Sequence, residues 1–84
     1  MDNEFTKEVI EIFPNPITSK LTIRLPNTIN KATVSVVSIE GKEILKNTID
    51  KQHHEIDFSQ FANGIYFVNI ENGGRTLSYK VVKE

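Results

Sequence analysis

The chain has 84 residues, of which 38% are hydrophobic and 25% are charged, and its formal net charge is −1. This length suits one small domain, and the composition is too apolar and too evenly charged for a disordered chain. A net charge near zero argues against nucleic acid or an anionic membrane as the main partner. The absence of cysteine excludes disulfide bonds and thiol chemistry.

Residues 1–8 precede the first β-prone run and lack the charged and apolar regions of a signal peptide. We expect them to be the remnant of an upstream linker or added residues, so that the folded domain spans residues 9–84. If the protein is exported, its signal peptide is expected upstream of Met1. No run of about 18 apolar residues is present, which argues against a membrane-spanning helix.

Short β-prone runs at intervals of about ten residues predict an all-β fold, an antiparallel β-sandwich of about seven strands. Each run alternates apolar and polar residues, as expected when successive side chains face opposite sides of a strand. No longer stretch keeps a helical period, so helix should be nearly absent. The expected strands are residues 9–13, 20–25, 31–39, 43–49, 53–58, 65–70 and 76–82.

Proline and glycine mark the clearest turns between these runs. Pro14-Asn15-Pro16 ends the first run, because proline cannot donate to a strand ladder. Gly41 and the Asn72-Gly73-Gly74 stretch predict tight hairpins between neighbouring strands. In the third run the alternation slips between Val36 and Val37, which predicts a β-bulge there.

The stretch from residue 58 to residue 71 is the strongest structural signal in the chain. Its strand, residues 65–70, is apolar on both faces, which predicts a central place in its sheet. Phe58 and Phe61 are three residues apart, as in one tight helical turn, and predict an aromatic plug over one end of the core. Gly64 can then turn the chain with a positive φ. The expected core is Ile12, Leu21, Ile23, Leu25, Val34, Val36, Ile56, Tyr66, Val68, Ile70, Leu77, Tyr79 and Val81.

Candidate chemical sites are few. His53 and His54 have metal-ligand chemistry, but neighbours on a strand face opposite sides and so would not share one ion. The Gly73-Gly74 turn leads into a strand, whereas a phosphate-binding loop leads into a helix. No carboxylate pair or activated nucleophile has a catalytic spacing. We therefore expect no enzymatic activity, no metal and no cofactor.

A series of short motifs follows a characteristic order along residues 12–84. The motifs are Phe13-Pro14-Asn15-Pro16, Leu21-Thr22-Ile23, Gly41-Lys42, Ile56-Asp57-Phe58-Ser59, Gly64-Ile65-Tyr66-Phe67-Val68 and Lys80-Val81-Val82-Lys83. In this order and at these spacings, the chain resembles the type A C-terminal sorting domain of the type IX secretion system of Bacteroidetes. Phe13 stands where that family often has Tyr, and Phe61 where Leu is usual, and both keep a bulky apolar group.

The resemblance implies an Ig-like β-sandwich at the C-terminus of a secreted cargo protein, acting as an address label. The implied partners are an N-terminal cargo domain, the outer-membrane shuttle of the type IX translocon and a sortase-like peptidase that commonly removes the domain. The implied destination of the cargo is the cell surface or the medium, reached through the periplasm and the outer membrane.

The motifs are expected to divide into a recognition end and residues that specify the fold. We expect Lys80, Val81, Val82 and Lys83 to be recognised by the translocon, through strand addition to the last hairpin. The alternative is that the two lysines only keep an edge strand soluble. The residues expected to specify the fold are Pro14, Asn15, Pro16, Gly41, Gly64, Ile65 and Tyr66.

A function of another class is the alternative: a carbohydrate-binding or adhesive β-sandwich module of a secreted protein. Such a module presents exposed aromatic side chains on one face or a calcium loop, and the sequence offers only Phe5 and Phe67 for that purpose. Exposed edge strands could also pair two copies into a weak homodimer.

Overall fold

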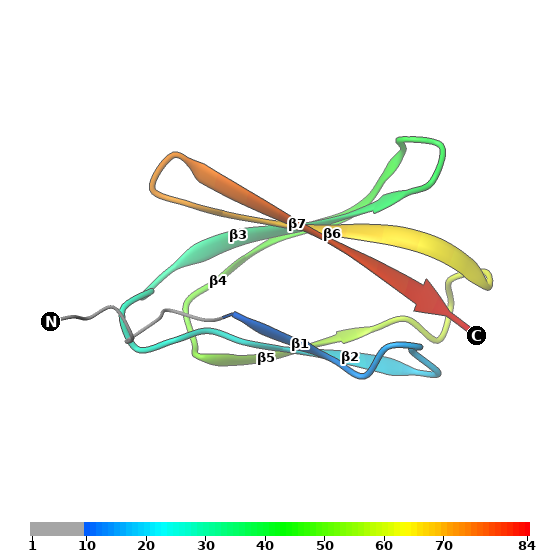
Figure 1. Cartoon of the computed structure of the whole chain (residues 1–84), viewed down its shortest axis with the longest axis horizontal. Helices are drawn as coiled ribbons and strands as arrows, with labels where there is room; N and C mark the ends of the chain where they lie inside the picture. Colours follow the sequence, from blue (N-terminus) through cyan, green and yellow to red (C-terminus); the bar gives the residue numbers. More distant parts are fainter. Residues whose placement is uncertain (1–9) are drawn as a thin grey trace, which may run out of the picture.

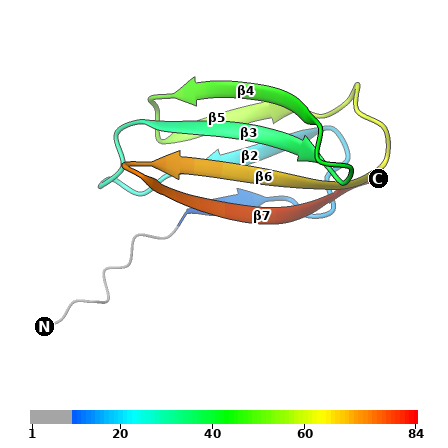
Figure 2. The same cartoon turned by 90° about the horizontal axis from the view of Figure 1, so that it is seen from above.

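The computed structural model describes residues 10–84, over which the chain forms seven strands in two antiparallel sheets packed face to face (Figures 1 and 2). One sheet has the strand order β1-β2-β5 and the other has the order β4-β3-β6-β7. Within the described residues, no helix is long and apolar enough to cross a membrane. The strands are β1 (Glu11–Phe13), β2 (Lys20–Arg24), β3 (Ala32–Ser38), β4 (Glu43–Ile49), β5 (His53–Asp57), β6 (Gly64–Asn72) and β7 (Arg75–Lys83).

The core lies between the two sheets because each strand turns alternate side chains inward. Strand β2 buries Leu21 and Ile23, while β6 buries Tyr66, Val68 and Ile70. Burial of apolar surface is the dominant favourable term in folding, so these inward rows hold the sheets together. The predicted all-β sandwich is confirmed, and the division of its strands between the two sheets is Ig-like.

The predicted strands lie within a few residues of the observed ones, except that Val9 falls outside the described residues. The irregularity expected between Val36 and Val37 coincides with a register shift between β3 and β4. The additional residue is Ile44 on β4, which the register skips, and the alternation within β3 itself is unbroken. Val37 therefore simply faces the outer side of its sheet.

The core differs from the predicted one in its outlying members. Leu77, predicted as core, is 41% exposed, and Ile12 and Tyr79 are only partly buried. Leu77 lies on an edge strand near the β6–β7 turn, where Ile10 and Ile29 border it without covering it. The sequence pattern identifies the face of a strand, but it does not show where the opposite sheet stops. The buried hydrophobic residues absent from the predicted core are Ile17, Ala32, Ile49 and Phe58.

An aromatic cluster closes one end of the core, as the spacing of Phe58 and Phe61 predicted. Phe58 is fully buried, and its ring makes edge-to-face contacts with those of Phe61 at 4.8 Å and Tyr66 at 5.7 Å between centroids. The Phe61 N–H donates to the Phe58 carbonyl at 2.9 Å and closes the tight turn. The Tyr66 hydroxyl donates to the Ala62 carbonyl at 2.6 Å, which ties this turn to β6, the strand between β3 and β7.

Both predicted hairpins are confirmed. Gly41, with φ of 91°, donates its N–H to the Ser38 carbonyl, and the Ser38 N–H donates to the Lys42 carbonyl, each at 2.9 Å. This is a type I turn followed by a bulge at a left-handed glycine, a common three-residue hairpin loop. Gly73 and Gly74, with φ of 61° and 85°, form the two-residue turn between β6 and β7.

Replacing Phe58 by alanine should lower the free energy of unfolding by about 3–5 kcal/mol, because a fully buried ring leaves a cavity. The matched control is Ile39→Ala, since Ile39 is 61% exposed and should change stability by no more than about 0.5 kcal/mol. Urea unfolding followed by circular dichroism measures both values. If Phe58→Ala does not fold, Phe58→Leu should show a smaller loss. Equal losses for the buried and the exposed site would contradict the plug.

Candidate recognition site

The Pro-Asn-Pro motif and the end of the chain meet along the outer edge of β7. The Val82 N–H donates to Asn15 Oδ1 at 3.0 Å, and Asn15 Nδ2 donates to the Lys80 carbonyl at 3.4 Å. The Ile17 N–H donates to the Val82 carbonyl at 2.7 Å, and the Glu84 N–H donates to the Ile17 carbonyl at 2.8 Å. Residues 15–17 thus form an edge latch, the name we use below for this segment and its bonds to β7.

The sequence of the latch explains why it leaves the first sheet. Pro14 and Pro16 have no N–H groups to extend the β1–β2 ladder, and both X-Pro peptide bonds are cis. The chain resumes at Ile17, which is fully buried and forms a parallel bridge with Lys83 in the other sheet. Because the latch pairs backbone groups that an edge strand would leave open, strand addition at this end of β7 is blocked in the folded domain.

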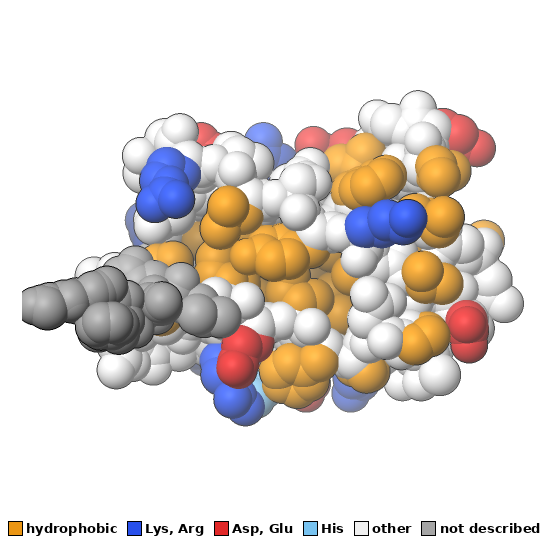
Figure 3. Space-filling view, in the orientation of Figure 1, with side chains coloured by type: hydrophobic (Ala, Val, Ile, Leu, Met, Phe, Trp, Pro, Cys, Tyr) orange, Lys and Arg blue, Asp and Glu red, His pale blue; other side chains and the backbone are white. Residues whose placement is uncertain are grey.

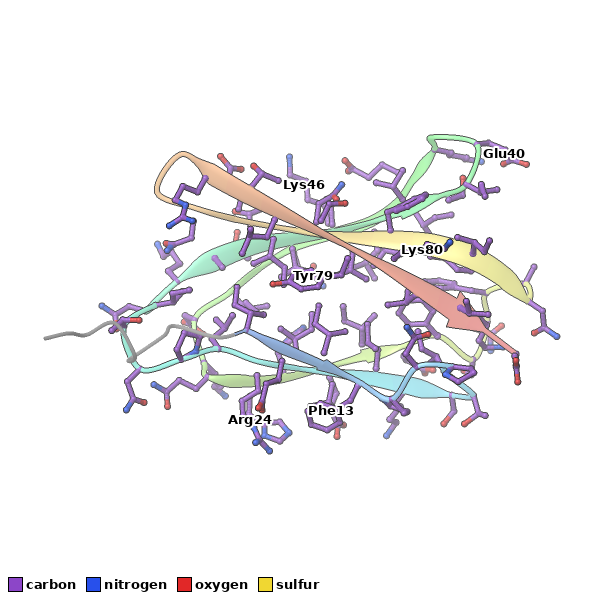
Figure 4. All side chains as sticks on the ribbon, in the orientation of Figure 1. Phe13, Arg24, Glu40, Lys46, Tyr79 and Lys80 are labelled. Carbon is purple, nitrogen blue, oxygen red and sulfur yellow. The ribbon has the colours of Figure 1, made fainter. Side chains whose placement is uncertain are left out.

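The four residues of the lysine motif point alternately to the two faces of the sheet. Val81 and Lys83 face the core and are 2% and 7% exposed. Lys80 is exposed and Val82 partly exposed on the opposite face. Figure 4 shows Tyr79 between the two sheets and Lys80 on the other side of β7. The motif therefore presents a single exposed charge, that of Lys80.

Lys83 is a structural lysine in this arrangement. Its Nζ donates to Asn63 Oδ1 at 3.3 Å, and its side chain lies on the inward face beside Val81. An ammonium group that is largely removed from water needs such a partner, while its aliphatic stem packs with apolar neighbours. Asn63 precedes Gly64, which has a φ of 154° and is the first residue of β6. Lys83 thereby joins the last strand to the turn before the central one.

Most of the residues predicted to specify the fold gather at this same end of the sandwich. Pro14, Asn15 and Pro16 carry the latch, and Gly41 lies apart at the tip of the β3–β4 hairpin. A groove of about 480 Å³ separates that hairpin from residues 60–66. The remaining three pair in register with the lysine motif: Gly64 with Lys83, Ile65 with Val82 and Tyr66 with Val81.

Sequence reasoning missed Ile17 and the bonding role of Asn15. Ile17 stands alone among polar residues and prolines, so alternation assigns it to no strand face. Asn15 bonds to a residue 67 positions away, and this pairing cannot be read from local pattern. The available signal was the asparagine enclosed by two prolines, since that side chain can satisfy backbone groups that proline cannot.

Phe13 and Arg24 lie together on the outer face of the smaller sheet (Figure 4). The Arg24 guanidinium lies 5.5 Å from the centroid of the Phe13 ring, and it also pairs with the Glu11 carboxylate at 3.1 Å. A cation over an aromatic face is weakly favourable at an exposed site. This contact accounts for a bulky aromatic residue at a position that is 40% exposed.

Two ionisable side chains respond to their surroundings. Burial raises the pKa of Tyr79 above its usual 10.0. Hydrogen bonds from the hydroxyl of Ser59 and then from its N–H, the latter at 2.9 Å, hold the pKa of Asp57 below its usual 3.8, and Lys20 contributes in the same direction. Among the described residues, no group of three His, Cys, Asp or Glu side chains could hold a metal ion, and His53 and His54 belong to none.

Comparison with known proteins identifies one family. The model of the secretion system C-terminal sorting domain matches residues 11–84, nearly the whole chain. No curated protein matches the chain. Among solved structures the chain is similar to PorZ, an essential bacterial surface component of the type-IX secretion system of Porphyromonas gingivalis, with a TM-score of 0.69 and 15% identity. The match covers 89% of this chain and 11% of that of PorZ, and at 15% identity this likeness shows the fold alone.

Removing the Asn15 side chain should open the latch. Asn15→Ala deletes the acceptor of the Val82 N–H, so that amide should exchange with solvent about ten-fold faster, and the free energy of unfolding should fall by about 1 kcal/mol. Asn15→Asp keeps the acceptor oxygen and should preserve slow exchange at Val82. Amide exchange followed by NMR measures the effect, and equal protection of Val82 in the wild type and Asn15→Ala would contradict it.

The hydrogen bonds from Ser59 to the Asp57 side chain should contribute to stability only when the Asp57 carboxyl group is ionised. The folded-state pKa is lowered, so the contribution is complete above about pH 5 and disappears as the pH falls through 3.8 and then through the folded-state pKa. Asp57→Asn should therefore flatten the fall in the urea midpoint between about pH 5 and pH 2. Identical slopes in the wild type and the variant over that range would contradict this role.

Proposed function

Because the chain belongs to the family of secretion system C-terminal sorting domains, we propose that the translocon recognises it at the latched end of β7. A domain of this family is the sorting signal of the type IX secretion system, and it directs a protein through the outer membrane to the cell surface or the extracellular space. The family is one of sorting signals and not of enzymes. Its match does not favour the carbohydrate-binding alternative.

The observation that carries the proposal is the position of Lys80 beside the latch. Its carbonyl is held by Asn15, while its ammonium group stays exposed on the outer face of the larger sheet. The recognised feature is then a folded surface, namely Lys80 and Val82 with their neighbours on β6. Val81 and Lys83 act indirectly, because their burial fixes the strand that presents the other two.

In this proposal, strand addition is confined to the part of β7 that the latch does not reach. Val82 and Glu84 direct their backbone groups to the latch, so by strand alternation Thr76 and Ser78 direct theirs to the same outer edge. The latch reaches Lys80 and not these two residues. A partner strand would pair near Thr76 and Ser78, next to the exposed Leu77.

The partners we propose are the outer-membrane shuttle of the translocon, a sortase-like peptidase and an N-terminal cargo domain. Residues 9–84 form the sorting domain in this proposal, and residues 1–8 are the remnant of the linker to the cargo. Cleavage then falls upstream of β1, which keeps the peptidase away from the latched end. The cargo is afterwards anchored to the cell surface or released.

A charge reversal at Lys80 tests recognition without removing a core strand. We fuse the chain behind a fluorescent protein with a periplasmic signal peptide and express it in a type IX-competent host. Lys80→Glu should reduce the reporter at the surface and in the medium by about ten-fold, as expected when one partner of an interfacial charge pair is reversed. The matched control is Lys46→Glu, an exposed lysine on β4, which should be exported normally.

Lys83→Met separates structure from recognition, because it keeps the buried stem and loses the ammonium group with its charge and its bond to Asn63. It should lower stability and leave export of the folded fraction unchanged. Folding of each variant is checked by circular dichroism on the purified domain. Normal export of Lys80→Glu, or equal defects at Lys80 and Lys46, would remove Lys80 from the proposed recognition surface.

A further inference from the structure

One row of side chains crosses the whole outer face of the larger sheet. The register places Glu43 of β4 opposite Val37, Val37 opposite Phe67, and Phe67 opposite Lys80. The row therefore begins with an exposed carboxylate, continues through two partly buried apolar side chains and ends with an exposed ammonium group. We refer to these four residues as the outer row.

The surroundings of the outer row differ on its two sides. Toward the latched end lie Ile65 and Val82, which are partly buried and paired with each other. In the orientation shared by Figures 3 and 4, hydrophobic side chains border the lysine at the position labelled Lys80. Toward the other end the face is polar, and the Ser78 hydroxyl donates to Asn69 Oδ1 at 2.7 Å. The apolar area is thus confined to one half of the face.

The outer row is complementary to itself. A two-fold axis parallel to the strands and lying between two such faces reverses the order of the row in the second copy. Lys80 of each copy then lies opposite Glu43 of the other, and Phe67 of each lies opposite Val37 of the other. Both charges are matched and both apolar residues are covered, as in the aligned packing of two sheets.

The geometry points to a second copy of this chain as the occupant of this face. Four strands about 4.8 Å apart and three outward rows about 7 Å apart give roughly 400 Å² per copy. Two such areas amount to roughly 800 Å², below the range of stable interfaces and suited to a weak, transient dimer. The dimer forms through sheet faces and not through the edge of β7, since the latch occupies the end of that edge.

Sedimentation equilibrium of the full chain from about 10 μM to about 1 mM tests the dimer, with a Kd expected in the upper part of that range. Lys80→Glu and Glu43→Lys should each raise the Kd about ten-fold, because each places like charges together twice per dimer. The double variant Lys80→Glu/Glu43→Lys should restore the wild-type Kd. Restoration distinguishes a specific row-to-row contact from general stickiness.

Two further variants test the apolar part of the row. Phe67→Ser should abolish association up to about 1 mM, and the milder Phe67→Ala should still weaken it measurably if Phe67→Ser fails to fold. Leu77→Ser is the control, since Leu77 is an exposed apolar residue that lies away from the outer row, and this variant should associate normally. A wild type that stays monomeric at about 1 mM, or a double variant that is not restored, overturns the inference. Sedimentation uses no secretion component, so its failure leaves the export proposal standing, and the reverse also holds.

Discussion

The rest of the structure depends on the closing of the outer edge of β7. This strand supplies Val81 to the core, yet it is the last strand of its sheet, where half of its backbone groups would otherwise remain unpaired. Asn15 and Ile17 supply partners for one end of this edge, at Lys80, Val82 and Glu84, from a segment that has just left the opposite sheet. The two sheets are therefore joined by hydrogen bonds at one end, in addition to the apolar contacts between them.

The four residues of the lysine motif, residues 80–83, have two roles because they lie on a strand. Successive side chains of a strand face opposite sides, so Lys80 and Lys83, which are three residues apart, lie on opposite faces of the sheet. Lys83 enters the core and bonds Asn63, whereas Lys80 keeps its charge on the outer face. A protein that binds this end encounters Lys80 with Val82, and Val81 between them is hidden from it.

The sequence predicted the strands, the two hairpins and the aromatic plug well, because each rests on local chemistry: alternation, glycine at positive φ, and two phenylalanines three residues apart. It failed where the answer depends on distant segments. Leu77 is on the correct face but lies where Ile10 and Ile29 only border it. Ile17 is buried because it pairs with a strand 65 or more residues later, and no local period records such a pairing.

Motifs from distant parts of the sequence meet at one end of the folded domain. Gly64, Ile65 and Tyr66 form one side of the ladder whose other side is the lysine motif, and Pro14 to Pro16 hold its outer edge. Each of these segments is held in place by hydrogen bonds to the others. If the translocon reads the surface proposed above, the signal exists only in the folded domain, because the contacts that stabilise the sandwich also hold Lys80 and Val82 in place.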